Sequence, residues 1–327
     1  MVNSLHRPVY HVLLPGLLDP FPQRSASIPA SPLLEKLLSR ADRNVAPLDY
    51  PATLCKLFGL PSSPEQPLAT AALSYHATAT GQVTPLPDTY LLHADPIHLR
   101  PDQDRLLACD LHHQPLTREE ATQFANIFND HFADTQIEII IAEPNTWFLA
   151  VPQPPALQTQ PLSMVLGRNI DHFLPTGPEA SLWRARLNEI HMLWYQAEPN
   201  IRREAAGQLT VSGIWLSGGG LLPKPTPQRF RQVTGDCLIL QGLAHRAAKT
   251  GTHNPSTVQL ESAPGRAILD ADPTAWISAL EQLEHTLANL LQHELYLYPC
   301  AGQVWHWQPS MRYRWWRRTT SITDWSK

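Results

Sequence analysis

The stretch Val211-Ser-Gly-Ile-Trp-Leu-Ser-Gly-Gly-Gly220 leads from an apolar strand directly into three glycines. Glycine tolerates positive φ and close backbone approach, so Gly218, Gly219 and Gly220 predict a built turn at a strand end. Open α/β folds keep their ligand crevice at such ends, which makes Ser217 to Gly220 candidate ligand-binding residues. The stretch matches neither the P-loop, which needs Lys-Ser/Thr, nor the dinucleotide motif G-x-G-x-x-G. A structural turn is the commoner interpretation.

The chain around this stretch has the composition of a large globular protein. It has 327 residues, of which 43% are hydrophobic and 17% charged, enough for two lobes. Its net charge of -4 predicts no general attraction to nucleic acid or anionic lipid. Residues 1–8 lack the apolar segment of a secretory signal, and no stretch approaches a membrane span. We therefore expect a cytoplasmic protein.

The cysteines exclude one class of metal site. They are far apart in the sequence and form no C-x-x-C pair, which argues against a cysteine zinc site. Widely spaced single cysteines are typical of reduced thiols in the cytosol. The residues concerned are Cys55, Cys109, Cys237 and Cys300.

The N-terminal part predicts a strand and a helix. Val9 to Leu14 is a short apolar run that ends at Pro15-Gly16, typical of a buried strand. A helix is expected from Pro32, with Ser31 as its N-cap. The proline-rich residues 61–87 predict a connection.

The middle of the chain predicts a small α+β lobe. Thr117-Arg-Glu-Glu120 is a capping box that begins a helix with an apolar face. Glu143-Pro-Asn-Thr146 joins two apolar strands and predicts a hairpin. The mixed charges of Ala94 to Arg105 predict a solvated loop. The strands expected around these features are Tyr90–Leu92, Leu106–Cys109, Ile137–Ala142 and Trp147–Val151.

After Pro178 strands alternate with helices. This order predicts an α/β fold with a mainly parallel sheet flanked by helices, plus the inserted α+β lobe. The long helix near the C-terminus is expected to begin at the cap Asp272-Pro273. The other predicted elements are a helix over Trp183–Trp194, strands at Ile214–Leu216, Cys237–Leu240, Thr257–Leu260 and Leu295–Tyr298, a helix through Ala247 ended by Gly251, and the aromatic segment Val304–Trp307.

The order of elements resembles the archaeal-type cofactor-independent phosphoglycerate mutases of the alkaline phosphatase superfamily. A shortened bacterial branch of phosphoglycerate mutase-like regulatory proteins, the RpfE type, is more similar still. The resemblance implies an alkaline-phosphatase-like core from residues 1–87 and 176–327, with an inserted lobe and exit linker at 88–175. It is carried by Thr117–Val151, Glu198–Arg203, Ser212–Gly220 and Phe230–Gly251.

The departures from the family bear on function. Such mutases pass a phosphoryl group through a serine with two divalent metals. Here the nucleophile region is Pro47-Leu-Asp-Tyr-Pro51, without serine, and the first strand ends in Pro15-Gly16 instead of Asp-Gly. Residues 257–269 lack the family's histidines, and the late Asp-His pair is replaced by Tyr298-Pro-Cys300. The resemblance thus implies a catalytically degenerate regulatory or scaffold protein, with no catalytic residue, metal or cofactor.

Two alternatives keep a ligand or an activity. Asn200, Arg202 and Arg203 lie in a motif that the family uses near its substrate phosphate, so a small phosphorylated or carboxylate ligand is one expectation, and surface arginines are the other. Asp19 and Asp49, with scattered histidines, could rebuild a metal site of an active mutase or phosphatase. Turn-forming aspartates beside prolines are the commoner explanation.

Two further groups of side chains have simpler interpretations. His112-His113 favours a solvated loop, because neighbours on a strand point to opposite faces. Ser217 has no His–Asp pair placed beside it by any sequence signal, so a nucleophilic role is not expected.

The C-terminal run Met311-Arg-Tyr-Arg-Trp-Trp-Arg-Arg318 interleaves arginine with tryptophan. Three interpretations remain open: the tryptophans pack on the core, the segment binds a protein partner, or it binds nucleic acid. No membrane partner is expected. The candidate partner-binding residues are Arg312, Arg314, Trp315, Trp316, Arg317 and Arg318.

Overall fold

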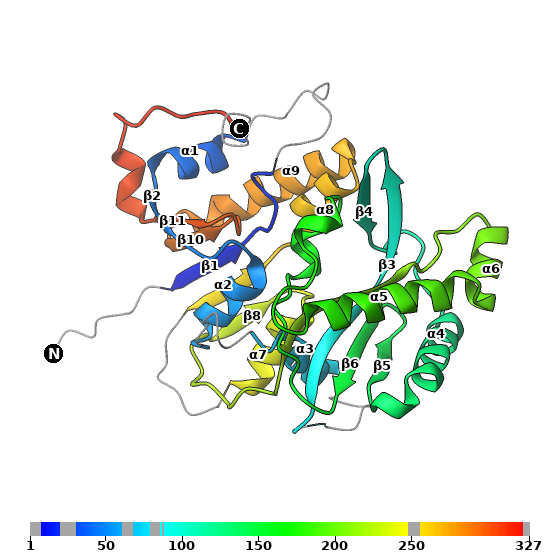
Figure 1. The fold of residues 1–327 in the computed structure, drawn as a ribbon. Coiled ribbons are helices and arrows are strands. Elements are labelled where there is room, and N and C mark those ends of the chain that lie inside the picture. The colour runs from blue at the N-terminus through cyan, green and yellow to red at the C-terminus, as the bar shows by residue number, and fades with distance from the viewer. Residues whose placement is uncertain are drawn as a thin grey trace. The chain divides into compact units, whose positions relative to one another are not determined.

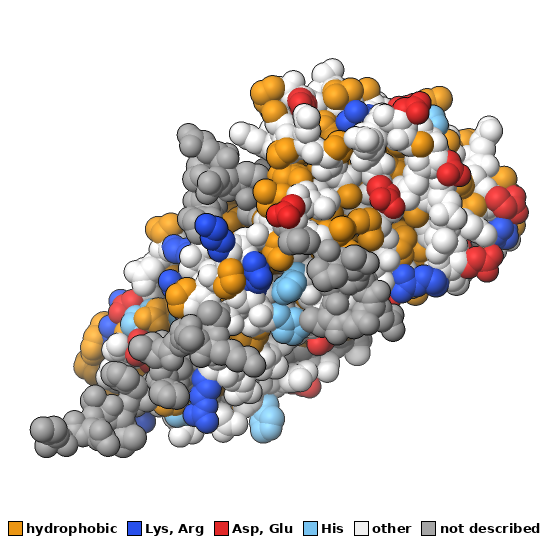
Figure 2. Space-filling model, turned by 90° about the horizontal axis from the view of Figure 1, so that it is seen from below, with side chains coloured by type: hydrophobic (Ala, Val, Ile, Leu, Met, Phe, Trp, Pro, Cys, Tyr) orange, Lys and Arg blue, Asp and Glu red, His pale blue; other side chains and the backbone are white. Residues whose placement is uncertain are grey.

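The computed structural model describes residues 8–19, 31–60, 68–78, 86, 88–247 and 256–322. The chain forms two compact units. The first combines Met1–Pro61 with Pro225–Lys327, and the second is Ser62–Lys224, inserted between them in sequence (Figure 1). No helix in the described ranges is long and apolar enough to cross a membrane. Acidic, basic and apolar side chains are interspersed over the face that Figure 2 shows.

The first unit is built on a six-stranded sheet in the order β2-β11-β10-β1-β9-β8. The strands β10, β1, β9 and β8 pair in parallel, and β11 and β2 add antiparallel strands at one edge. The bounds are β1 (Val9–Leu13), β2 (Asp42–Val45), β8 (Gln232–Thr234), β9 (Thr257–Leu260), β10 (Glu294–Tyr298) and β11 (Gln303–Trp307).

The helices of this unit cover the sheet. As expected, α9 begins at Asp272, whose carboxylate accepts from the amides of Thr274 and Ala275. The stripe of apolar residues on α9 packs against α1 and the sheet in one buried cluster. The helices are α1 (Pro32–Arg40), α2 (Tyr50–Leu57), α7 (Leu238–Arg246), α8 (Ala263–Leu269), α9 (Pro273–Leu290) and the 3₁₀ turn η4 (Pro309–Tyr313).

The start of α1 differs from the prediction. Ser31 precedes the helix but forms no side-chain cap. Instead the carboxylate of Glu284, on α9, accepts from the amides of Leu33 at 3.0 Å and Leu34 at 2.7 Å. The orphan donors of the helix start are therefore satisfied by a residue distant in sequence.

The second unit is an antiparallel sheet between helices. Strands run in the order β4-β3-β6-β5, and β7 also pairs with β3. One face buries an aromatic-rich core with α4 and α5, and the other carries α3. The elements are α3 (Thr70–Thr78), β3 (Tyr90–Asp102), β4 (Arg105–Cys109), α4 (Arg118–His131), β5 (Glu138–Glu143), β6 (Thr146–Val151), α5 (Ala180–Tyr195), α6 (Glu198–Ala205), β7 (Gly213–Gly220) and the short turns η1 (Ala133–Thr135), η2 (Leu162–Met164) and η3 (Ile170–His172).

The predicted fold class is confirmed: a sheet with parallel strands is flanked by helices, and an α+β unit is inserted. The capping box at Thr117 and the hairpin at 143–146 are also present. The inserted unit has other bounds than the 88–175 expected from sequence. This is because β7, expected in the parallel sheet, pairs antiparallel with β3.

Three local predictions are corrected. Cys237–Leu240 is not a strand but the start of α7, since a short apolar run suits either structure. Ala94–Arg105 is not a loop: β3 continues to Asp102 and turns into β4. The connection expected over 61–87 contains the largely buried helix α3. Gly251 and most of the rest of 61–87 lie outside the described residues.

Candidate functional site

The three glycines at the end of β7 allow a helix to approach the strand. Gly218 has φ +60°, and a Cβ there would overlap the hydroxyl oxygen of Thr70. A Cβ on Gly220 would overlap Ala69, directly before α3. The glycines therefore allow the start of α3 to pack against β7. The predicted turn is wrong, because the strand continues through Gly220 and pairs there with β3. Ser217 beside them is buried.

Two titratable residues of β3 lie near these glycines, and the sequence interpretation missed them as site residues. His93 pairs in register with Ser217, and Asp95, two residues on, lies on the same face of the sheet. Burial lowers the pKa of His93 to about 4, although a hydrogen bond with the backbone of Thr70 acts in the opposite direction and raises it. Burial raises the pKa of Asp95 to about 7. The only available sequence signal was two polar residues alternating in an apolar strand.

Asn200 belongs to the interior. Its side-chain amide donates to the carbonyl oxygens of Trp194 at 2.8 Å and Val211 at 2.9 Å. Its oxygen accepts from the amide of Val211 at 2.8 Å. Asn200 therefore fastens the end of α5 to the segment that leads into β7.

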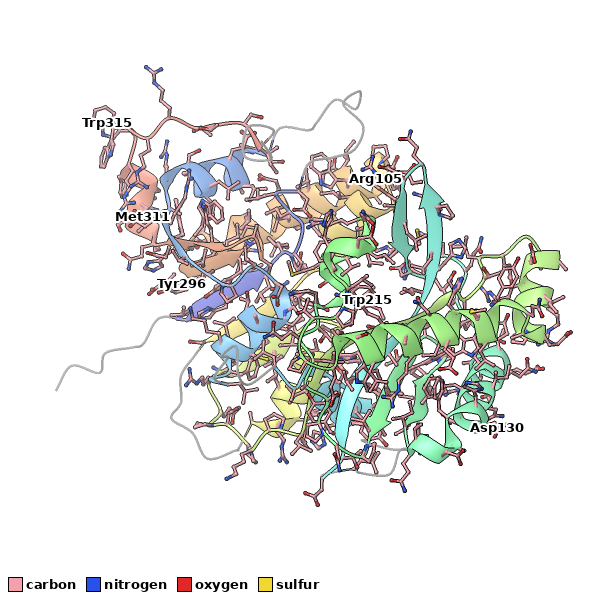
Figure 3. The ribbon with its side chains drawn as sticks, in the orientation of Figure 1. Arg105, Asp130, Trp215, Tyr296, Met311 and Trp315 are labelled. Carbon is pink, nitrogen blue, oxygen red and sulfur yellow. The ribbon has the colours of Figure 1, made fainter. Side chains whose placement is uncertain are left out.

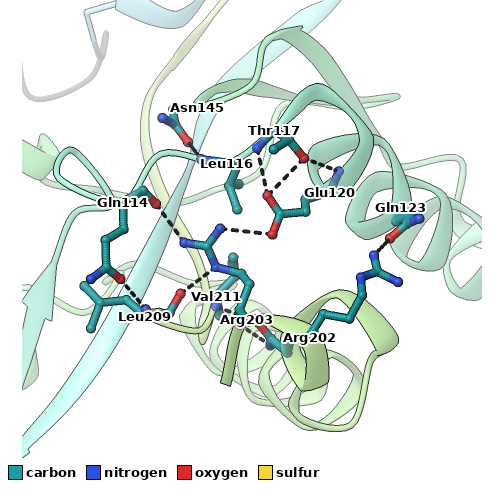
Figure 4. A network of polar contacts seen from close by, with 11 residues as sticks. Gln114, Leu116, Thr117, Glu120, Gln123, Asn145, Arg202, Arg203, Leu209 and Val211 are labelled. Carbon is teal, nitrogen blue, oxygen red and sulfur yellow. Dashed lines mark hydrogen bonds and ion pairs between the residues drawn. The ribbon is translucent and has the colours of Figure 1, made fainter. Parts of the chain in front are cut away.

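Arg203 is the centre of a buried polar network (Figure 4). Only 1% of its side chain is exposed. The guanidinium donates to the carbonyl oxygens of Leu209 at 2.6 Å and Gln114 at 2.7 Å, and to the carboxylate of Glu120 at 3.1 Å. The network joins α6, the loop before β7 and the capping box of α4.

The next residue, Arg202, has a different environment. Its guanidinium donates to Gln123 at 2.5 Å and forms an i,i+4 ion pair with Glu198 at 3.5 Å, with 45% of the side chain exposed. Of the three residues in the predicted anion motif, Arg202 is therefore the most accessible.

The structure does not bring the motif and the glycines together. Asn200 and Arg203 contact the segment before β7, whereas Gly218 to Gly220 form its far end. A strand rises about 3.3 Å per residue, so the part of β7 from Gly213 to Gly218 alone spans about 16 Å. A small anion cannot touch both groups. Ligand binding by either group alone stays a prediction.

The carboxyl end of β1 is closed by helix α8. The amide of Leu14 donates to the carbonyl oxygen of Tyr298 at 2.8 Å, and the chain then turns at Gly16, where φ is +77°. A Cβ on Gly16 would lie 2.8 Å from the Cα of Gly265, and a Cβ on Gly265 would overlap the carbonyl oxygen of Pro15. The first turn of α8 therefore rests backbone to backbone on this strand end.

Of the two acidic residues near this edge, Asp49 has a structural role and Asp19 is exposed. Asp49 is the N-cap of α2, accepting from the amide of Ala52 at 2.7 Å, and burial raises the pKa of its carboxyl group. The amide of Asp19 donates to Gly16 in the turn after β1. Within the described ranges, no group of three His, Cys, Asp or Glu residues is arranged to hold a metal ion. His112 and His113 lie exposed in a turn, as expected.

The cysteines are thiols, with no disulfide among the described residues. Burial raises the pKa of Cys55 and of Cys300 to about 12. Both thiols are therefore protonated at neutral pH and are poor nucleophiles.

The C-terminal segment is divided between anchored arginines and exposed tryptophans. Arg314 forms a bidentate ion pair with Asp42 at 2.5 and 3.0 Å, and Arg317 donates to the carbonyl oxygen of Ala41 at 2.8 Å. Trp315 and Trp316 are 79% and 64% exposed, and Trp315 lies at the outer side of the segment that follows η4 (Figure 3). The interpretation that these two tryptophans pack on the core is therefore wrong.

No protein-family model and no curated protein sequence matches the chain. Among solved structures, the chain is similar to the PH0037 protein from Pyrococcus horikoshii, with a TM-score of 0.50 and 12% identity over 92% of this chain and 87% of that one. A cofactor-independent phosphoglycerate mutase from Thermoplasma acidophilum also matches, with a TM-score of 0.37 and 14% identity over 92% and 89%. The likeness to PH0037 shows a shared fold.

Proposed function

We propose that this chain is a phosphoglycerate mutase-like member of the alkaline phosphatase superfamily that has lost phosphoryl transfer and acts as a regulatory or scaffold protein. The sequence resemblance supports the superfamily, and the fold shared with PH0037 is compatible with it. Placement in the shortened regulatory branch is the finer part of the proposal. It rests on the sequence resemblance alone.

The strand end Pro15-Gly16, where proline stands in place of the family's aspartate, carries this proposal. The family places an aspartate, a metal ligand, at the end of the first strand. Here that strand end is Pro15-Gly16, and its backbone touches the backbone of α8. The aspartate position is taken by Pro15, whose side chain has no atom that could bind a metal, and an added Cβ at the neighbouring Gly16 would meet Gly265.

The role of Asp49 as a helix cap supports the same proposal. Its carboxylate caps α2 in the region where the family has its nucleophile. A capping carboxylate satisfies backbone donors of its own helix, and the raised pKa opposes the ionised form that a metal needs.

The test combines metal content with turnover. Purified protein is incubated with Mn²⁺ or Zn²⁺, desalted and assayed for bound metal and for turnover of 3-phosphoglycerate and p-nitrophenyl phosphate. An active mutase treated in parallel is the control. We expect substoichiometric metal and no turnover above buffer. Stoichiometric metal with turnover of either compound would instead establish the alternative, an active enzyme with a rebuilt site.

A second candidate function is supported by the exposed Trp315 and Trp316. Tryptophan is enriched at protein interface hot spots. Arg314 and Arg317 are already bound to Asp42 and to backbone carbonyls, which leaves fewer cations for phosphates and favours a protein partner over nucleic acid.

This candidate is tested with the double variant Trp315→Ala/Trp316→Ala. Met192, 76% exposed, provides the control Met192→Ala. A host protein retained by wild type and by the control, but not by the double variant, would support the partner surface. Salt-sensitive oligonucleotide binding that the double variant loses would favour nucleic acid instead.

A further inference from the structure

One face of the sheet in the first unit carries a pocket of about 580 Å³. This volume lies within the range of small-molecule sites. Residues of β1, β2, β10 and β11 form its floor, and α2 and the segment at Arg229 contribute to its walls. The floor includes His11 and Tyr296, from the middle of their strands. Gly265 is not among the lining residues that the structure describes, but Pro47 and Tyr298, from two of the regions where the chain departs from the family, are.

The floor is a ladder of stacked rings. Tyr296 lies between His11, at 4.9 Å between ring centroids and 8° between planes, and His306, at 4.4 Å and 7°. Phe230 meets His11 edge-on at 5.5 Å. Because the rings stack across neighbouring strands, they cover one another's faces and direct their edges away from the sheet.

The ladder is held in place by its polar atoms. The hydroxyl of Tyr298 lies 3.1 Å from Nδ1 of His11. The hydroxyl of Tyr296 donates to Glu294 at 3.2 Å, and Nε2 of His306 lies 2.9 Å from the same carboxylate. The rings are therefore fixed before a ligand arrives, which reduces the entropy lost on binding.

Two cations line the pocket, and the carboxylate of Glu294 is bound by the hydroxyl of Tyr296 in its floor. The edge of an aromatic ring carries partial positive charge, so a ladder of edges attracts the electron-rich face of another ring. Lys56 and Arg229 line the wall, and the described lining residues include no aspartate or glutamate. The Arg229 guanidinium lies over Gly59, where a Cβ would overlap it. Burial lowers the pKa of His11 to about 4, so this part of the floor is uncharged at neutral pH.

We propose that this pocket binds a planar aromatic anion, whose ring lies on the edges of His11 and Tyr296 and whose charge meets Lys56 and Arg229. A ligand with a ring and no charge would fit any apolar surface. A ligand with a charge and no ring would bind equally well at many surface sites. The two features together define the ligand class. The proposal is independent of whether phosphoryl transfer has been lost.

Three probes of one shape test the ligand class by calorimetric titration. They are 2-naphthoate, its neutral analogue 2-naphthalenemethanol, and the saturated decahydro-2-naphthoate. We expect 2-naphthoate to bind at one site, at least about tenfold more tightly than either analogue. Absence of saturable binding, or equal affinity for the neutral analogue, would overturn the proposal. Equal affinity for the saturated acid would do the same.

A double variant tests the location. Lys56→Gln/Arg229→Gln removes both cations from exposed positions, so folding should be retained and is checked by thermal unfolding. The matched control is Lys224→Gln/Arg168→Gln, which removes the same charge from the other unit. We expect the first variant to bind 2-naphthoate about tenfold more weakly and the control to bind as wild type. Equal affinities in the two variants would place the ligand elsewhere. Neither titration depends on metal or turnover, so this proposal and the proposed function fail separately.

Discussion

Arg203 donates to the carboxylate of Glu120 at 3.1 Å, with 1% of the arginine side chain and 14% of the glutamate side chain exposed. Glu120 is also the last residue of the capping box and the third residue of α4, where it accepts from the amide of Thr117 at 2.8 Å. Burial opposes ionisation of Glu120, but hydrogen bonds from Thr117 and Arg203 outweigh it and hold its pKa below the usual value. Arg203 was predicted to bind a ligand anion, but in the fold it binds the carboxylate of Glu120.

Replacing Arg203 by methionine is expected to destabilise the second unit. The substitution leaves Glu120 charged and half-buried, and leaves the carbonyl oxygens of Leu209 and Gln114 without this donor. Breaking a buried ion pair in this way costs about 3–5 kcal/mol in the free energy of unfolding. Arg202→Met, with its exposed partners, should cost less than about 1 kcal/mol. Urea unfolding measures both, and similar losses in the two variants would contradict the structural role.

A glycine pair in β7 tests the packing of α3. Gly218→Ala places a Cβ against Thr70 at a positive φ, so overpacking and backbone strain should together cost about 2–4 kcal/mol. Gly213 lies in the same strand, and a Cβ there meets nothing within 4 Å. We expect Gly213→Ala to change stability by less than about 1 kcal/mol. If both variants unfold at the same urea concentration, α3 does not pack closely against Gly218 of β7.

Asp95 predicts a loss of stability as the pH rises. Its pKa is about 7 in the folded chain, above the ordinary 3.8, so the folded state holds the proton more tightly than the unfolded state between these values. The free energy of unfolding therefore falls as the pH rises through this range. Asp95→Asn removes this dependence, and should gain up to about 4 kcal/mol relative to wild type between pH 4 and pH 8.

The control for the Asp95 variant is the same substitution at a solvent-exposed aspartate. Asp104 has 89% of its side chain exposed. Asp104→Asn should follow the wild-type dependence on pH throughout. If Asp95→Asn also follows wild type, Asp95 is solvated and its pKa is ordinary.

Local contacts were predictable from the sequence, and distant contacts were not. The caps at Thr117 and Asp272 involve residues within a few positions, so their pattern is visible in the chain. The cap of α1 comes from Glu284, 250 residues from Leu34, and no pattern near Ser31 indicates it. The partner of β7 is also distant in sequence, and no local pattern indicates that it is β3. This is why β7 was expected in the parallel sheet.

The candidate site shows the same division. The position of Ser217 beside three glycines was visible in the sequence, but two of the three partners of Arg203 lie 83 and 89 residues away. An Asn-x-Arg-Arg motif looks the same whether its arginines point to solvent or to a buried carboxylate. Burial, which separates Arg203 from Arg202, depends on packing between α4 and α6 and leaves no local signal.

The ring of His11 predicts a loss of stability in acid. Burial lowers its folded pKa to about 4, below the ordinary 6.5, so the unfolded state binds the proton more tightly between these values. Stability from this group is complete above pH 6.5 and is lost as the pH falls towards 4. His11→Phe keeps a flat ring between Tyr296 and Phe230 but cannot be protonated. Between pH 7 and pH 4 it should lose less stability than wild type, by up to about 3 kcal/mol. His112→Gln, on an exposed turn, is the control and should show the wild-type loss. Parallel pH profiles for His11→Phe and wild type would mean that the pKa of His11 is the same in the folded and unfolded chain, and that burial does not lower it.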